Sequence, residues 1–343
     1  MKTVYRILLA IIGTATATQL YAQDIHLSQF YETPILRNPA LIGIFNGDVR
    51  VQAVYRNQWN SVTIPYQTGT LSGEIKFPVG RSNDYVTTGL QLTYDRAGTS
   101  KLQSTQIFPA INYHKSLNED KSSFLSLGFM GGYVQRQFDP GNMTFNNQYT
   151  NGRFDPTMPT GEEGKLAFKG YSYLDMGVGL SYNGVIREDV NYFIGAGYFH
   201  FNGAKISFYN DQNIVLQPKI TFNAGITIPV DERVKVIAHY NQLHQGTYSE
   251  YIGGALIGYG LMNQGLESTR AIYGGMFLRW NDAIIPTIKI DMDKYEVAMS
   301  YDTNISNLRT ASQTFGGFEI SLVFKGFLNS RNSTLESLNC PRF

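Results

Sequence analysis

The chain has 343 residues, of which 43% are hydrophobic, 13% aromatic and 16% charged, and its formal net charge is +1. This hydrophobic content excludes a disordered chain, and the nearly neutral charge gives no concentrated basic surface for nucleic acid. The single cysteine, Cys340, excludes an internal disulfide, so the fold alone must hold the chain together.

The first residues have the pattern of a secretory signal peptide. Lys2 and Arg6 precede an apolar run, and a tract of small residues then leads to Ala22. We expect residues 1–22 to be removed. Gln23 rather than a cysteine follows the expected cleavage site, so we expect a mature protein without a lipid anchor.

The stretch 23–47 does not alternate cleanly between apolar and polar residues, and it contains Pro34 and Pro39. Such a stretch is a poor strand, because proline cannot donate to a sheet. We therefore expect an irregular segment ahead of the strands described next. In a barrel built from those strands, this segment would fold into the periplasmic mouth or line the lumen.

From residue 48 onward, apolar and polar residues alternate with a period of two, which is typical of strands with one apolar and one polar face. About fourteen such segments follow, an even number as in single-chain outer-membrane barrels. They cover residues 48–57, 66–77, 84–95, 102–114, 122–138, 171–182, 192–201, 216–228, 233–242, 248–260, 270–280, 283–291, 295–302 and 314–325.

The connections between these segments alternate in length. Short polar connections follow the even-numbered segments, whereas the odd-numbered ones are followed by long stretches such as 139–165 and 202–217. This is the arrangement of periplasmic turns and outer loops. We predict that residues 48–325 form an all-β, transmembrane antiparallel β-barrel in the outer membrane lipid, and that residues 326–343 form a periplasmic tail.

A soluble β-sandwich is the alternative, because it also has alternating strands. Its outer face would be charged, whereas the polar face here is rich in glycine, threonine, serine and glutamine. Aromatic residues also recur near the strand ends, as in interfacial girdles. These residues are Tyr55, Trp59, Tyr66, Tyr85, Tyr94, Tyr113, Tyr182, Tyr192, Tyr240, Tyr259, Trp280 and Tyr301.

Charges of both signs occur on the face predicted to point into the lumen. Pairing across the wall can offset the cost of placing them in a narrow space of low dielectric constant. A simple open pore is therefore not expected; the pairs either help a peptide to dock or only stiffen the wall. The predicted lumen charges are Arg50, Glu74, Lys76, Lys235, Lys289, Glu296 and Glu319.

Four stretches, in this order, resemble one family. They are "QDIHLSQFYETPILRNPALIG", "YRNQW", "YDTNISNLR…FGGFEISLVFK" and the closing "CPRF". Together they are similar to the PorP/SprF family of type IX secretion system outer-membrane proteins of the Bacteroidota. The chain has Asn60 where the family commonly has a proline after the tryptophan.

The resemblance implies a barrel of the fatty-acid-transporter-like type that works in protein secretion or gliding motility. It implies secreted proteins with C-terminal sorting domains as partners, together with periplasmic and outer-membrane components of the secretion machinery. A transporter for hydrophobic solutes is the alternative function. It would need an apolar inner pocket and a kinked strand that opens sideways into lipid.

Two groups of residues are candidates for partner binding. The first group, Arg56, Asn57, Gln58 and Trp59, ends the first predicted strand, with Arg56 pairing inside the barrel and Trp59 anchoring at the interface. The second group lies before the wall and would act as a gate or a periplasmic contact. It consists of Ser28, Gln29, Phe30, Tyr31, Asn38 and Pro39.

No motif predicts an enzyme, a metal site or a cofactor. The sequence has no His-Glu-x-x-His, Gly-x-Ser-x-Gly, P-loop or Cys-x-x-Cys pattern. His239 and His244 are too loosely spaced for a specific metal site, and Asp291 and Asp293 lack the calcium-loop pattern. We expect no catalytic residues, and Cys340 is either a docking residue or inert.

Overall fold

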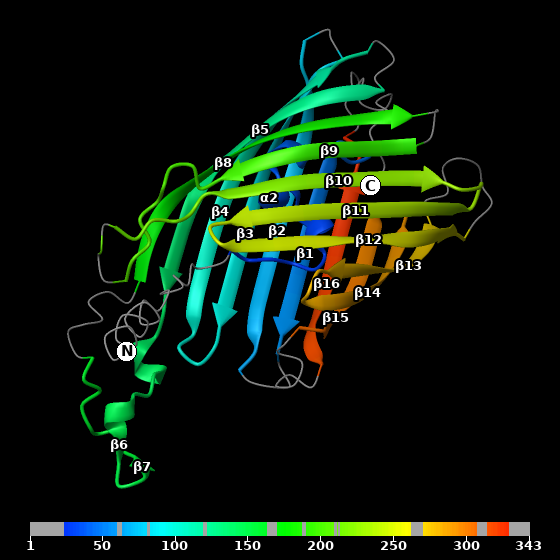
Figure 1. Cartoon of the computed structure of the whole chain (residues 1–343). Helices are drawn as coiled ribbons and strands as arrows, with labels where there is room; N and C mark the ends of the chain where they lie inside the picture. Colours follow the sequence, from blue (N-terminus) through cyan, green and yellow to red (C-terminus); the bar gives the residue numbers. More distant parts are fainter. Residues whose placement is uncertain are drawn as a thin grey trace, which may run out of the picture.

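Antiparallel strands close into one barrel, with each strand hydrogen-bonded to two neighbours around the ring (Figure 1). The computed structural model describes residues 24–59, 64–80, 83–118, 122–162, 170–186, 190–208, 211, 213–261, 270–306 and 314–328. The predicted signal peptide, Cys340 and nearly all of the predicted tail lie outside the described residues.

Fourteen strands form the wall, in the order β1-β16-β15-β14-β13-β12-β11-β10-β9-β8-β5-β4-β3-β2. Their bounds are β1 Val49–Gln58, β2 Tyr66–Pro78, β3 Tyr85–Ala97, β4 Leu102–Ser116, β5 Ser123–Gln137, β8 Gly170–Ile186, β9 Val190–Phe199, β10 Lys219–Pro229, β11 Val234–Gln245, β12 Tyr248–Gly260, β13 Arg270–Arg279, β14 Ala283–Met292, β15 Tyr295–Asn304 and β16 Phe315–Gly326.

The remaining elements are short. Before the wall lie η1 (Phe30–Glu32), α2 (Pro34–Arg37) and η2 (Pro39–Leu41), and the connection between β5 and β8 carries η3 (Pro140–Asn142), η4 (Asn146–Gln148), β6 (Tyr149–Thr150) and β7 (Arg153–Phe154). Among the described residues, no helix has the length and apolar character needed to cross a membrane.

The predicted fourteen-stranded antiparallel barrel is confirmed. Each predicted segment overlaps one wall strand, and most ends agree within a few residues. The largest extension is at β8, which runs to Ile186, and β11 also runs further than predicted, to Gln245. Only Gly246 and Thr247 therefore separate β11 from β12, and Gly246 supplies the positive φ of +58° that this tight turn needs.

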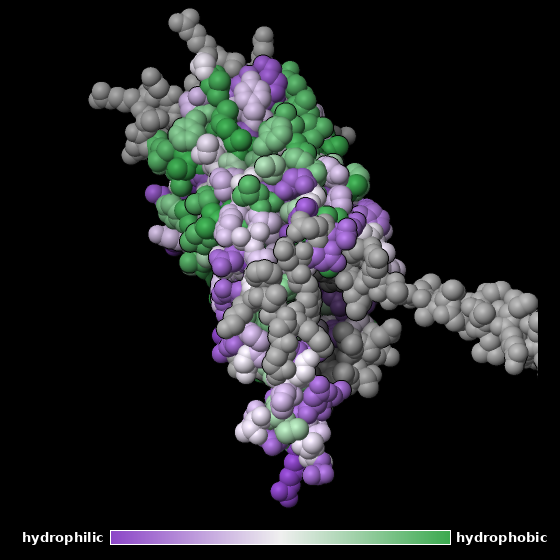
Figure 2. Space-filling view, turned by 90° about the vertical axis from the view of Figure 1, so that its left-hand side faces the viewer, coloured by the Kyte–Doolittle hydropathy of each residue, from purple (hydrophilic) through white to green (hydrophobic). Residues whose placement is uncertain are grey.

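The two faces of the wall have opposite character. On β5, Leu127 and Phe129 point outward and are 46% and 49% exposed, whereas Ser126 points inward and is fully buried. Figure 2 shows one side of the molecule, where apolar residues gather over the upper part and hydrophilic residues over the lower part. The apolar outer face is the surface that a barrel presents to lipid.

The prediction of a girdle position is wrong for one residue, Tyr85. Tyr85 is fully buried, and its ring stacks on His114 with the ring centroids 4.0 Å apart. The reason is the period of two: Tyr85 shares a face with Thr87, which also points inward. Tyr94 and Trp280 are 46% and 64% exposed, as girdle residues should be.

The barrel has two different ends. Short connections, such as 79–84, 230–233 and 293–294, lie at the end where β1 begins, which we name the turn end. The long connections 138–169 and 200–218 lie at the opposite end, which we name the loop end. In outer-membrane barrels, short turns face the periplasm and long loops face the outside.

Candidate functional site

Residues 24–48, which we name the lumen segment, lie inside the ring of strands. The segment starts near the loop end, where Asp24 contacts Lys219 at the beginning of β10 and Gln245 at the end of β11. It reaches the turn end at Asp48, whose backbone N–H donates to Gly326. The segment therefore runs through the barrel from one end to the other before the wall begins.

Near the loop end, five buried charges from five strands form one group, the loop-end cluster. Arg56 Nη2 lies 3.0 Å from Asp302 Oδ2, and Arg56 Nε lies 3.4 Å from Glu319 Oε1. Arg279 lies 3.2 Å from Asp302 and 3.8 Å from Glu250. Because each charge has a partner of opposite sign, the cluster avoids the cost of an isolated buried ion.

The lumen segment is bound directly to this cluster. The backbone N–H groups of Ser28 and Gln29 donate to the two carboxylate oxygens of Glu319, at 2.6 and 2.8 Å. Ser28 Oγ also donates to Asp302, and the Gln29 side chain bonds to Ser300 and Ser321. The carboxylates of the wall therefore hold the segment as well as pairing with the arginines.

A second buried group holds the start of the segment. Asp24 contacts both Lys219 and His200, and the other ring nitrogen of His200 lies 2.8 Å from Asp175. Lys219 and His200 thus anchor the start of the segment through Asp24.

Rings of the segment fill the middle of the lumen on one side. Phe30 packs edge-on against Phe277 with the ring centroids 5.8 Å apart, and Tyr31 stacks on His239 at 5.2 Å. The guanidinium of Arg37 lies 4.9 Å from the centre of the Phe30 ring. These contacts make part of the lumen an apolar core.

Asn38 and Pro39 contact the inner face of β10 and β5. Asn38 Nδ2 donates to Asn223 Oδ1 at 2.9 Å, while its Oδ1 accepts from the backbone N–H of Ala40. Pro39 comes so close to β5 that a Cβ on Gly128 would lie 2.4 Å from its carbonyl carbon. Glycine at position 128 thus makes room for the segment.

At the turn end, wall charges also bind the segment. Glu74 pairs with Arg50 at 2.7 Å and accepts from the backbone N–H of Gly43 at 2.8 Å. Lys76 donates to the carbonyl oxygen of Phe45 and lies 4.2 Å from the centre of its ring. These predicted lumen charges thus face the lumen and contact the segment.

The other predicted lumen charges pair mainly along the wall. Glu296 lies between Lys289, at 2.7 Å, and Lys325, at 2.6 Å. Lys235 lies over the ring of Tyr273, 5.0 Å from its centre. The inward face therefore carries some charges that contact the lumen segment and others that pair along the wall.

The rim residues after Arg56 lie at the end of β1. Trp59 packs against Tyr66 with the ring centroids 5.1 Å apart, and its backbone N–H donates to Gly316. Among the described residues, no donor reaches the buried Asn57 Oδ1. Gln58 is half-buried beside them. Arg56 faces the lumen, whereas Trp59 packs at the end of the strand.

Several residues of the site were not predicted from the sequence. Arg279, Glu250 and Asp24 join buried clusters although each lies at the end of a strand or outside one. Alternation gave a partial signal for Asp302, which shares the polar face of its strand with Glu296 and Ser300. It could not show which charges from different strands meet.

The described residues contain no cluster of histidine, cysteine, aspartate or glutamate suited to a metal ion. The contacts of the site hold the lumen segment: buried carboxylates accept from its backbone N–H groups, and aromatic rings fill the space beside it.

The family model described as "Type IX secretion system membrane protein PorP/SprF" matches residues 19–324. The chain belongs to this family. The predicted family is thus confirmed, and this PorP/SprF protein is an outer-membrane barrel of the type IX secretion system. No curated protein matches its sequence.

Two solved structures are among those similar to this PorP/SprF protein. The TodX monoaromatic hydrocarbon channel (a deltaS2S3 mutant) is 10% identical, with a TM-score of 0.46 over 84% of this chain and 92% of that one. The translocator domain of autotransporter NalP from Neisseria meningitidis is 9% identical, with a TM-score of 0.42 over 83% and 90%.

Proposed function

We propose that this PorP/SprF barrel binds or anchors secreted proteins through their C-terminal sorting domains, and that the partner docks on the loop end. The observation that carries the proposal is the lumen segment, which occupies the barrel from Asp24 to Asp48. A folded partner has no passage through a lumen filled in this way, so the exposed ends are the surfaces on which it can rest.

The rim formed by Asn57, Gln58 and Trp59 is the proposed docking surface. It lies directly above Arg56, which is bound to Asp302, Glu319 and the backbone of His26. A rigid base of this kind limits the conformational entropy that a docking loop loses on binding. Arg56 therefore acts as a positioning residue rather than as a contact.

The second candidate group, Ser28, Gln29, Phe30, Tyr31, Asn38 and Pro39, is proposed as a gate. All six contact the wall within the lumen, so they are accessible to a partner only if the segment moves. The turn end is the proposed contact for periplasmic components of the secretion machinery. We further propose that the protein is not an enzyme.

A transporter of hydrophobic solutes is less well supported. Buried polar residues such as Thr87, Asn112 and Ser181 line part of the lumen, and rings of the lumen segment fill its apolar part. The cavity beside Asp24 and Phe199 has about 20 Å³, which is room for about one water molecule. A hydrophobic solute would need an apolar pocket of several hundred cubic ångströms.

Affinity purification of the tagged protein in a gentle detergent tests the proposal. We expect secreted proteins with C-terminal sorting domains and components of the secretion machinery to co-purify, and we expect a deletion strain to lose these proteins from its secretome. An unchanged secretome together with no co-purified partner would favour solute transport.

The two tryptophans provide a matched pair of variants for the rim. Trp59→Ala should weaken capture of the partner, because this ring packs on Tyr66 beside the docking surface. Trp280→Ala removes a ring that is 64% exposed at the connection between β13 and β14, and it should leave capture unchanged. Equal capture by both variants, with normal insertion, would remove the rim from the proposal.

A further inference from the structure

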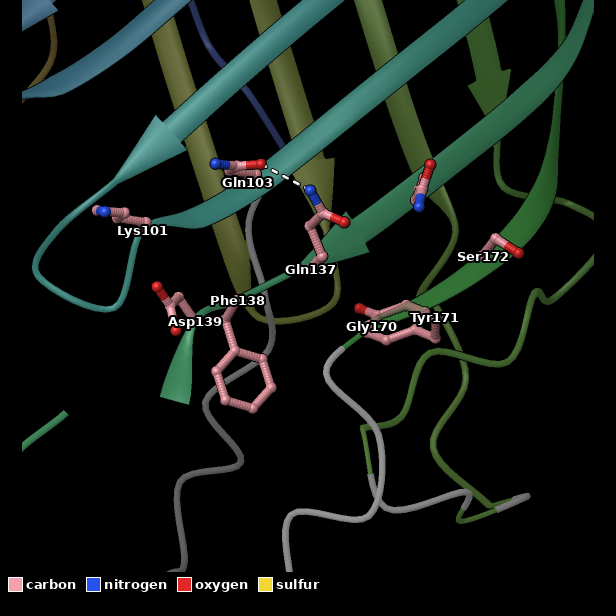
Figure 3. Close-up of a pocket in the computed structure, with 9 residues that line it drawn as sticks. Lys101, Gln103, Gln137, Phe138, Asp139, Gly170, Tyr171 and Ser172 are labelled. Atoms are coloured by element: carbon pink, nitrogen blue, oxygen red, sulfur yellow. Dashed lines mark hydrogen bonds between the residues drawn. The ribbon is translucent and has the colours of Figure 1, made fainter. Parts of the chain in front are cut away.

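A polar hollow lies on the outer face of the wall, just beyond the apolar belt at the loop end (Figure 3). Its volume is about 610 Å³, within the usual range for small-molecule sites. We name it the rim pocket. It is lined by Lys101, Gln103, Gln135, Gln137, Phe138, Asp139, Gly170, Tyr171 and Ser172.

The position of the rim pocket follows from the register of β4, β5 and β8. Residues paired across these strands form rows on the lipid-facing side, and alternate rows are about 7 Å apart. The row of Ile107, Tyr133 and Leu174 is apolar, and each of its members is at least 43% exposed. The next rows toward the loop end are polar, with Gln135 beside Ser172 and then Gln137 beside Gln103.

This change from apolar to polar marks the upper edge of the hydrocarbon. In an outer membrane, the groups directly above that edge are the sugars of the outer-leaflet glycolipid. Gln103, Gln135, Gln137 and Ser172 therefore point sideways at the level of those sugars. The docking rim at Trp59 belongs to a different connection.

The chemistry of the pocket fits a neutral, hydroxyl-rich ligand. Glutamine side chains both donate and accept, as sugar hydroxyls do. Gln137 Nε2 donates to Gln103 Oε1 at 2.7 Å, which fixes the orientation of both amides, as Figure 3 shows. The pocket has one lysine and one aspartate, so its charges balance and favour neither a phosphate nor a cationic peptide.

Two aromatic rings border the pocket and are held in place. Phe138 and Tyr171 both pack edge-on against Phe208, with ring centroids 4.8 and 4.7 Å apart. These contacts fix the ends of the two strands on which Gln137 and Ser172 lie.

The backbone at the floor of the pocket is already paired with neighbouring strands on both sides. Gln137 is paired with Gln103 on one side and with Gly170 on the other. A peptide could not add a strand there, because strand addition needs a free sheet edge. We propose that the rim pocket binds an oligosaccharide, namely the sugar portion of the outer-leaflet lipopolysaccharide, and so fixes the barrel to its own membrane.

The test is titration of the purified full chain with de-acylated oligosaccharide prepared from the organism's own lipopolysaccharide. We expect saturable binding that weakens about tenfold or more in the double variant Gln135→Ala/Gln137→Ala, because two hydrogen-bonding side chains are lost. Gln67→Ala is the matched control, since Gln67 is a lipid-facing glutamine near the loop end of β2 but outside the pocket. The control should bind as the parent chain does.

A second arm distinguishes the membrane glycolipid from a soluble glycan. The protein in lipid nanodiscs should retain intact lipopolysaccharide more tightly than the free oligosaccharide, and the double variant should lose this retention. The proposal is overturned if the parent chain does not bind the oligosaccharide, if the double variant binds as well as Gln67→Ala, or if the pocket variants weaken only the capture of secreted proteins. Normal capture of secreted proteins by the double variant separates this outcome from the proposed docking function.

Discussion

At the scale of single residues, the path of the segment through the lumen depends on glycines, which lack side chains, as well as on paired charges. Gly128 and Gly179 leave space on adjacent strands for Pro39 and Asn38. A Cβ at Gly179 would lie 1.9 Å from Asn38 Oδ1, which no real contact allows. Glycine in these strands therefore has a packing role that its weak strand propensity would not suggest.

A pair of glycine variants tests this close approach. Gly128→Ala should displace the lumen segment and make residues 24–47 more sensitive to protease, because the new Cβ meets backbone that cannot rotate away. Gly131→Ala is the control on the same strand, since its Cβ would meet Met176 at an ordinary 3.8 Å. Limited proteolysis followed by mass spectrometry measures the difference; equal protection of the segment in both variants would contradict the prediction.

Asp84, in the connection before β3, gives a prediction about pH. Burial by itself would raise its pKa, but hydrogen bonds from Tyr113, Lys115 and the backbone of Ser116 lower it to about 2. Its unfolded value is about 3.9, so its contribution to stability is present above about pH 4 and is lost as the pH falls toward 2.

The measurement is the melting temperature in detergent at pH 5 and at pH 2.5. The parent chain should lose more stability over this interval than Asp84→Asn, which has no carboxylate to protonate. The same loss in both proteins would show that Asp84 does not carry the effect.

At the scale of elements, the lumen segment cannot fold by itself. Its helical pieces η1, α2 and η2 have three or four residues each, far below the length at which an isolated helix is stable. The wall supplies the missing stability through Glu319, Glu74 and Asn112, which bind its backbone. The wall, in contrast, closes through its own ladder, including the pairing of β1 with β16.

Deletion of residues 24–46 therefore has a predicted outcome. The barrel should still insert, because no strand of the ladder is removed, and the emptied lumen should conduct ions. Planar-bilayer recordings should show discrete open-channel steps that the parent chain lacks. Removal of 149–154, which contains the exposed hairpin of β6 and β7, is the control and should not open the lumen.

At the scale of the whole molecule, the outer face must match the bilayer all the way round. Phe129 lies in the apolar part of β5, while Gln135 lies three rows beyond it in the polar zone. Phe129→Lys should cost about 2–4 kcal/mol of folding free energy in lipid, and Gln135→Lys about 0–1 kcal/mol, because the cost of a lysine depends on its depth. Urea titration in lipid vesicles measures both; equal costs would contradict the placement of the belt.

The sequence alone determined the wall. Alternation places Arg56 inward and Tyr94 outward whatever the neighbouring strand is, and the lengths of the connections separate the two ends of the barrel. Both are local properties, because the period of two is set by the backbone of each strand. The family could also be read from short stretches that lie in order along the chain.

Only the tertiary structure decided what fills the barrel. The lumen segment has neither a helical nor a strand period, so its path from Asp24 to Asp48 depends on contacts with residues up to 292 positions away, as between Gln29 and Ser321. Arg279 and Asp302 meet for the same reason: closure of the ring brings their strands together around Ser28. A period describes one strand, whereas the site is made where several strands and the segment converge.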